Sequence, residues 1–270
     1  MAKKIGFIGC GNMGSAILNG ILEAGIVDKE NVLVSARSQE SKDRISEEFG
    51  VSIVSNDEVV MKSDIIFLAV KPGVFPTVIE EVKDLISDTH MPLIISVAAG
   101  MKIKKIEDLF GRDIKLVRTM PNTPALVGEA MSAICVNDNV DDKDKETVKE
   151  IFESFGEAEF IPESLMDAVI GVSGSSPAYI YMLIEAMADG AVLSGMTRKQ
   201  AYKFAAQSVL GSARMVLESG IHPGELKDAV CSPGGTTISA VEVLEEKGFR
   251  DAVISAEKAA VDKSIEMSKN

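Results

Sequence analysis

The chain has few of the side chains on which many catalytic sites are built. Its 270 residues include no tryptophan, two histidines and three cysteines. Cys10, Cys135 and Cys231 lie far apart without metal-ligand spacing, so we expect no metal site. An odd, sparse set of cysteines is typical of reduced thiols, and we therefore expect a cytoplasmic protein. Neither His90 nor His222 has the setting of a general base, so we expect both to be structural or solvated.

Long apolar runs and excess positive charge are also missing. No stretch of about 18 uncharged apolar residues occurs, so we expect no membrane span. A strand pattern begins at residue 5, so we expect no signal peptide. The net charge of −13 argues against nucleic acids and anionic membranes as partners. Hydrophobic residues make up 46% of the chain, which is enough for a sizeable core.

Strand and helix patterns alternate over about the first 160 residues. The strands that we expect are residues 5–8, 32–35, 51–54, 65–70, 93–97, 115–120, 130–136 and 158–161. The helices expected between them are residues 12–24, 40–49, 75–86, 103–110 and 141–155. This alternation predicts an α/β fold with a doubly wound, mainly parallel, Rossmann-type sheet.

The pattern changes near Pro162, after which almost all the periodicity is helical. We therefore predict two domains, a dinucleotide-binding domain of residues 1–162 and an all-helical domain of residues 163–270. Thr197 to Gln200 has the form of a capping box and predicts a long helix to about Ser219. Ser176 and Pro177 suit the cap and the first position of the preceding helix. The second half is more apolar than a small bundle needs, which predicts a homodimer interface there.

A glycine motif follows the first strand. Gly9, Gly11 and Gly14 form G-x-G-x-x-G between a predicted strand and a predicted helix. Such glycines allow a tight turn, close approach of the backbone to a pyrophosphate, and close packing of helix on strand. The alternative is a set of ordinary turn glycines. The strand before, the helix after and the second strand about 20 residues further on favour a dinucleotide site.

The end of the second predicted strand indicates which dinucleotide binds. NAD-dependent enzymes place a carboxylate there for the ribose 2′-hydroxyl, whereas this chain has Ser35, Arg37 and Ser38. These side chains can donate to a 2′-phosphate, and Arg37 adds positive charge. The alternative is that Arg37 is a solvated loop residue. We favour NADPH over NADH.

Other loops also carry features of a ligand site. Lys71 ends the fourth strand, where ligands sit in this architecture, although it is equally well explained as a surface lysine before Pro72. Residues 97–100 are small and would let a flat ring lie against them. Residues 228–238 read DAVCSPGGTTI, in which glycines and a proline at the start of a helix leave backbone amides free for an anion. The alternative there is an ordinary capped loop between two helices.

Five segments in this order closely resemble the pyrroline-5-carboxylate reductase family, over essentially the whole chain. They read IGCGNMG at residues 8–14, AVKP at 69–72, MPNTP at 120–124, GSSPAY at 174–179 and SPGGTT at 232–237. The last segment is the most specific, whereas the first is shared with many dinucleotide enzymes. The chain departs from the family pattern at Gly14, Ser176 and Cys231, where alanine, glycine and a hydroxyl residue are commoner.

The resemblance implies residues for both ligands. NADPH would contact Gly9, Cys10, Gly11, Asn12, Met13, Gly14, Ser35, Arg37, Asn56, Ala69, Val70, Lys71, Pro72, Val97, Ala98 and Ala99. The carboxylate of the small-molecule substrate would contact Ser232, Gly234, Gly235, Thr236 and Thr237, with Thr237 also near the ring nitrogen as the catalytic residue. A homodimer with intertwined helices is implied, and a larger ring of dimers is left open.

The implied reaction is hydride transfer from NADPH to the C=N carbon of 1-pyrroline-5-carboxylate, which gives proline. A protonated imine is already electrophilic, so the protein mainly has to hold two rings face to face. The alternatives are another NADPH-dependent imine or β-hydroxyacid reductase, and a non-enzymatic NADP-sensing regulator. Lys199, Lys203 and Lys227 are available to a β-hydroxyacid mechanism, but none lies beside a glycine-rich motif.

Overall fold

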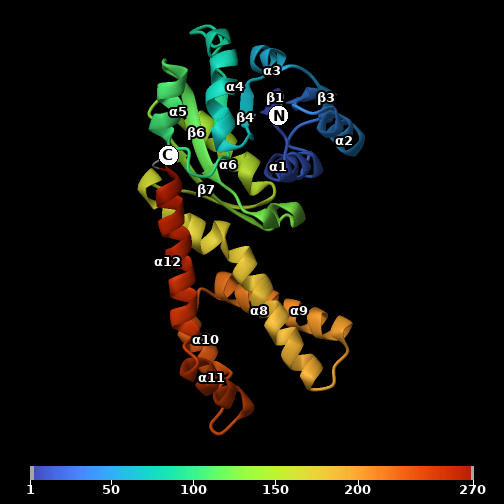
Figure 1. The fold of residues 1–270 in the computed structure, drawn as a ribbon, viewed down its shortest axis with the longest axis vertical. Helices are drawn as coiled ribbons and strands as arrows, with labels where there is room; N and C mark the ends of the chain where they lie inside the picture. The colour runs from blue at the N-terminus through green and yellow to red at the C-terminus, as the bar shows by residue number, and fades with distance from the viewer. Residues whose placement is uncertain (1–2, 269–270) are drawn as a thin grey trace. The chain divides into compact units, whose positions relative to one another are not determined.

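The computed structural model describes residues 3–268, and within them eight strands form one sheet (Figure 1). The strand order is β3-β2-β1-β4-β5-β6-β7-β8. Strands β1 to β6 are parallel, β7 runs antiparallel to β6, and β8 is parallel to β7. The bounds are β1 Ile5–Ile8, β2 Val32–Ser35, β3 Ser52–Ile53, β4 Ile65–Leu68, β5 Leu93–Ser96, β6 Lys115–Met120, β7 Ala130–Val136 and β8 Gly156–Phe160. The mainly parallel, doubly wound sheet that the sequence predicts is therefore confirmed.

Helices cover both faces of the sheet, which is why its central strands are continuous apolar runs. One face packs against α1 Asn12–Glu23, α2 Gln39–Phe49 and α6 Asp142–Glu153. The other packs against α3 Asn56–Lys62, α4 Phe75–Val82 and α5 Ile103–Phe110. Successive residues of a strand enter opposite cores: Phe7 stacks on Phe67 with ring centroids 4.7 Å apart, whereas Ile8 faces α3 and α4. Strand order reverses between β1 and β4, where ligands bind in such folds.

The helix α3 is absent from the sequence prediction. Its start carries a full capping box: the Ser55 hydroxyl accepts from the Glu58 amide, and the Glu58 carboxylate accepts from the Ser55 amide. This signal was present in the sequence, but the helix has only seven residues. The predicted third strand shrinks to two residues, and the helix predicted over 75–86 ends at Val82 and continues as a 3₁₀ turn.

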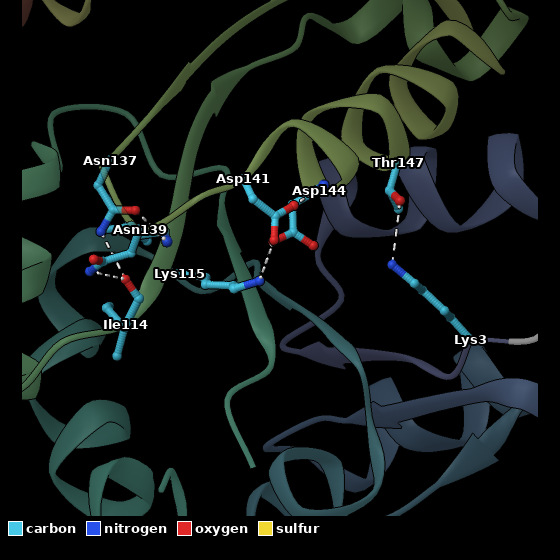
Figure 2. A network of polar contacts seen from close by, with 9 residues as sticks. Lys3, Ile114, Lys115, Asn137, Asn139, Asp141, Asp144 and Thr147 are labelled. Atoms are coloured by element: carbon cyan, nitrogen blue, oxygen red, sulfur yellow. Dashed lines mark hydrogen bonds and ion pairs between the residues drawn. The ribbon is translucent and has the colours of Figure 1, made fainter. Parts of the chain in front are cut away.

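A polar network joins β6, β7 and α6 (Figure 2). Lys115 Nζ lies 3.1 Å from Asp141 Oδ2 and 2.5 Å from Asp144 Oδ2, at the start of α6. Asn137 accepts from the Leu116 amide at 3.0 Å and donates to the Ile114 carbonyl at 2.8 Å. These bonds fix the far end of β7 against the start of β6, which is the one antiparallel pairing in the described sheet.

The second compact unit, residues 175–259, is helical. It contains α8 Ser176–Leu193, α9 Arg198–Ser219, α10 Pro223–Ala229, α11 Thr236–Glu246 and the first part of α12 Phe249–Ser268. One predicted cap is wrong, because the cap of α8 is Ser175 rather than Ser176. Thr197 is the N-cap of α9, which ends at Ser219 as predicted, but the capping box is not formed, since the Thr197 hydroxyl donates to the Gln200 side chain at 2.6 Å. Among the described residues, no helix is long and apolar enough to cross a membrane.

The first compact unit extends past the sheet to Gly174 and includes the chain again from Ala260. Buried Arg118 on β6 forms an ion pair with Glu163 at 2.8 Å, and Glu163 also accepts from the Ile103 amide at 2.7 Å. The end of α12 is held to this unit by the Ser264 hydroxyl, which donates to Asp167 at 2.5 Å. The compact units therefore divide at 174, a dozen residues beyond the pattern change that the sequence shows near 162.

Candidate cofactor and substrate sites

The glycine-rich loop lies between the end of β1 and the start of α1. Gly9 has φ +82°, and a Cβ there would lie 2.6 Å from Val70 Cγ1 and 3.0 Å from the Ala69 carbonyl oxygen. A Cβ at Gly14 would lie 3.2 Å from Ala69 Cβ. At Gly11 it would meet nothing within 4 Å. Two of the glycines therefore allow close packing against the β4 end, while Gly11 leaves open space next to exposed backbone.

The helix that follows offers backbone donors to an anion. Gly11 is the N-cap of α1, and no side chain of the described residues caps the first amides. Those amides and the helix dipole favour a bound phosphate. Arg44 on α2 fixes the glycine-rich loop, because its guanidinium donates to the Cys10 carbonyl at 2.9 Å and to the Ser15 hydroxyl at 3.3 Å. This contact spans 34 residues of sequence, so no local pattern predicts it.

The end of β2 lies beside this loop. The Gly9 amide donates to the Ser35 carbonyl at 2.9 Å, and the Ser35 hydroxyl donates to the Asn56 side chain at the start of α3. Asn56 in turn donates to Glu81 on α4 at 2.8 Å. Arg37 is exposed, and among residues 3–268 no acid pairs with it. An unpaired cation beside two polar side chains suits a phosphate ester.

The ends of β4 and β5 complete the same edge of the sheet. The Ala69 amide donates to the Ile8 carbonyl at 3.0 Å, and the Val97 amide to the Leu68 carbonyl at 3.4 Å. Lys71 and Ala99 are exposed, as is Pro72. Ala98 differs from its neighbours, because the residue is 4% exposed and packs in the core that faces α4 and α5. Its side chain therefore does not face a ligand.

The structure thus brings the predicted cofactor residues to one edge of one unit. The predicted substrate loop belongs to the other unit. Its turn is closed by the Gly235 amide, which donates to the Ser232 carbonyl at 3.0 Å, and Gly234 has φ +68°. The helix α11 begins at Thr236 with Gly235 as N-cap, so Pro233 lies in the turn before the helix and outside its first turn. No side chain in the described part of the chain caps this helix, which leaves its first amides free for a carboxylate.

The MPNTP segment has a role that its prolines do not suggest. Asn122 is buried, accepts from the Met131 amide at 3.0 Å and donates to Ser173. Ser173 belongs to a π-helical segment, Ile170–Gly174, that leads into α8. Such segments often occur at functional sites. Asn122 therefore joins the loop after β6 to the start of the helical region, a contact across 51 residues of sequence that local patterns do not reveal.

Two of the three thiols, Cys10 and Cys135, are buried. Burial raises the pKa of Cys10, and it raises the pKa of Cys135 to about 12. Both therefore stay protonated at neutral pH and lack the thiolate that a nucleophile needs. In the part of the chain that the structure describes, no three His, Cys, Asp or Glu side chains cluster to hold a metal ion.

These features fit a nicotinamide dinucleotide. Open space at Gly11, an uncapped helix start and an unpaired Arg37 match a pyrophosphate and a further phosphate. The fit comes from the chain's own backbone and side chains, independently of any relative.

Two family models match the chain. Residues 163–267 match pyrroline-5-carboxylate reductase dimerisation, and residues 4–100 match NADP oxidoreductase coenzyme F420-dependent. Pyrroline-5-carboxylate reductase of Escherichia coli is 52% identical over 271 residues and covers 100% of both chains.

Solved structures agree with these matches. A Coxiella burnetii pyrroline-5-carboxylate reductase has a TM-score of 0.92 at 36% identity and covers 100% of both chains. A Plasmodium falciparum pyrroline carboxylate reductase with NADP bound has a TM-score of 0.90 at 37% identity, covering 99% of this chain and 98% of that one. The glycine-rich edge, the uncapped start of α11 and these full-length matches lead to one assignment: the chain belongs to the pyrroline-5-carboxylate reductase family.

Proposed function

We propose that this protein reduces 1-pyrroline-5-carboxylate to L-proline, the last step of proline biosynthesis, with NADPH as hydride donor. The observation that carries the proposal is the full-length match to reductases of this name, 52% identical in one case. The chain retains both the glycine-rich edge and the SPGGTT loop. Bound NADPH would supply the hydride, which goes to the C=N carbon while the ring nitrogen keeps its proton.

The cofactor would lie along the carboxyl edge of the sheet. The backbone of residues 9–14 would hold the pyrophosphate, and Arg37 would pair with the adenosine 2′-phosphate. Ser35 and Asn56 would lie beside the adenosine ribose. Residues 69–72 and 97–99 would face the nicotinamide half. NADPH is favoured over NADH because no carboxylate follows β2, because Arg37 is unpaired among the described residues, and because a relative of similar structure has NADP bound.

The substrate carboxylate would bind at the start of α11. The amides of Gly234 and Thr236 and the Ser232 hydroxyl are donors in this loop, and the helix dipole adds to them. Gly235 would shape the site through its turn, because its amide already donates to the Ser232 carbonyl. Thr237 would orient the ring nitrogen or donate to it. This contribution is modest, because positioning two rings supplies most of the rate enhancement.

The domains and their assembly follow from the same proposal. Residues 1–162 would bind the dinucleotide, and residues 163–270 would bind substrate and form a homodimer, with a larger ring of dimers left open. The match of residues 163–267 to a dimerisation family supports this role. The sparse free cysteines are consistent with a cytoplasmic protein.

One assay separates this function from the alternatives. Purified protein is supplied with NADPH and either 1-pyrroline-5-carboxylate or a panel of β-oxo-acids, the oxidised partners of β-hydroxyacids. NADPH oxidation with the imine alone, with an equal amount of proline formed, is the expected result. Turnover of an oxo-acid instead would favour a β-hydroxyacid reductase. Tight NADPH binding without any turnover would favour a regulator.

A further inference from the structure

A chain of three polar side chains crosses the end of β2 where the adenosine 2′-phosphate would bind. The Ser35 hydroxyl donates to Asn56 Oδ1, and Asn56 Nδ2 donates to Glu81 Oε2 at 2.8 Å. The three residues come from β2, α3 and α4. Ser35 is 5% exposed, whereas Glu81 is exposed. Sequence motifs identify Ser35 and Asn56 but give no role to Glu81.

The direction of these hydrogen bonds is set by Glu81. An ionised carboxylate can only accept, so the Asn56 amide nitrogen faces Glu81 and its carbonyl oxygen faces Ser35. The single hydroxyl proton of Ser35 is then used on Asn56. In this state Ser35 offers a ligand lone pairs alone.

A Ser35 oxygen that can only accept interacts differently with NADH and with NADPH. A ribose 2′-hydroxyl can donate to the Ser35 oxygen, whereas a 2′-phosphate needs donors there. If the Asn56 amide were reversed, Asn56 would donate to Ser35, and the Ser35 proton would be free for a phosphate. Glu81 opposes that reversal because two acceptors would then face each other.

The negative charge of Glu81 also disfavours a 2′-phosphate at this place. Glu81 forms no ion pair within residues 3–268, so its negative charge is not neutralised by a neighbouring side chain. A 2′-phosphate close to Asn56 would be repelled by this charge, whereas Arg37, two residues after the end of β2, would attract the phosphate.

We propose that Glu81 is a cofactor-specificity residue: through Asn56 it makes Ser35 a hydrogen-bond acceptor, and it thereby limits the preference for NADPH over NADH. The inference rests on the proposed function, which puts the adenosine end at Ser35, Arg37 and Asn56. It predicts that the wild-type enzyme retains measurable use of NADH.

The test replaces the carboxylate with an amide of the same shape. Glu81→Gln removes the charge and supplies a donor, so Asn56 can turn and release the Ser35 proton. Isothermal titration calorimetry would measure the Kd of NADP⁺ and NAD⁺, and steady-state assays the KM of NADPH and NADH. The Kd for NADP⁺ should fall about three- to tenfold, the net effect of about one hydrogen bond, while the Kd for NAD⁺ does not fall.

The matched control is Glu80→Gln on the same helix. Glu80 pairs with Lys83 at 2.7 Å, and its side chain is 72% exposed. It carries the same charge but makes no hydrogen bond to Asn56 within residues 3–268, so the ratio of the NADP⁺ and NAD⁺ affinities should change less than twofold. The second comparison is Arg37→Ala, which should weaken the binding of NADP⁺ but not that of NAD⁺.

Two results would overturn the proposal in different ways. An unchanged ratio in Glu81→Gln, together with a weakened NADP⁺ affinity in Arg37→Ala, would leave the phosphate site in place and remove Glu81 from it. Unchanged ratios in both variants, with full reductase activity, would show that the adenosine end lies elsewhere while the proposed reaction stands.

Discussion

At the scale of single residues, the glycines of one motif differ in what they contribute. Gly9 has a positive φ and a crowded Cβ position, whereas Gly11 has neither. The sequence identifies all three glycines as a set, and only their surroundings separate packing from ligand approach. Sequence patterns likewise miss Arg44 and Glu81, because each acts across more than 20 residues of sequence.

The first prediction compares two substitutions in this motif. Gly9→Ala should lower the free energy of unfolding by about 2 kcal/mol or more, because it combines a left-handed backbone with a contact of 2.6 Å to Val70. Gly11→Ala should cost less than about 1 kcal/mol, yet weaken NADPH binding by filling the open space. Urea unfolding and calorimetric titration measure the two effects. Equal losses of stability would contradict this division of roles.

The second prediction concerns Thr237 in the first turn of α11. Thr237→Ala should lower kcat about tenfold without abolishing activity, the loss expected for about one hydrogen bond to the reacting ring. Thr237→Ser keeps the hydroxyl and should retain most of the rate. Steady-state kinetics with circular dichroism as a folding check would measure it. A folded but inactive alanine variant would mean that Thr237 is an essential proton donor.

At the scale of helices and strands, most of the first unit is predictable because its strands are buried on both faces and its helices are amphipathic. Four strands, including β1 and β6, match the predicted bounds residue for residue. The elements that the sequence does not predict are either short or held by contacts between residues far apart in the sequence. The seven-residue α3 begins with a capping box, and the π-helical segment before α8 is bonded to Asn122, 51 residues away in the sequence.

The third prediction follows from the network at the start of α6 (Figure 2). The hydrogen bond to Asp144 raises the pKa of Lys115 above its ordinary value of 10.5. A raised pKa stabilises the fold while the lysine is charged in both states, and that contribution is lost as the pH rises through the folded value. Lys115→Met should therefore cost about 1 kcal/mol at neutral pH, and the deficit should shrink above pH 10.5.

Chemical unfolding of wild type and variant across the pH range would measure this deficit. Lys145→Met is the control, because Lys145 pairs at 2.9 Å with Asp142, whose side chain is 94% exposed. It should change stability much less. A Lys115→Met deficit that is the same at neutral and high pH would indicate lost packing of the side chain rather than lost charge.

At the scale of the whole molecule, the two units differ in how well they bury their apolar side chains. The first unit has two extensive cores, whereas the helices α8 and α9 expose Leu193, Phe204 and Leu217 at 90, 66 and 80%. Large apolar side chains that are exposed together on a pair of helices are typical of an interface between subunits. The sequence predicts this excess from composition, but the division of the chain at 174 rests on contacts that no pattern shows.

The fourth prediction tests the proposed dimer. Phe204→Asp places a charge on the exposed apolar surface of α9 and should convert a dimer to monomer at micromolar concentration, with most of the activity lost. Met61→Asp is the control, because Met61 is 52% exposed on α3 in the other unit. Sedimentation velocity would distinguish the two. A wild-type protein that sediments as a monomer would refute the dimer itself.

The central claim is that the chain moves a hydride from NADPH to the imine carbon of 1-pyrroline-5-carboxylate. Its most direct test supplies NADPH that carries two deuterium atoms at the reactive nicotinamide carbon and follows the product by mass spectrometry. The prediction is proline with one deuterium at C5, formed in equal amount to the NADPH oxidised. Proline without the label, or NADPH oxidation without proline, would contradict it.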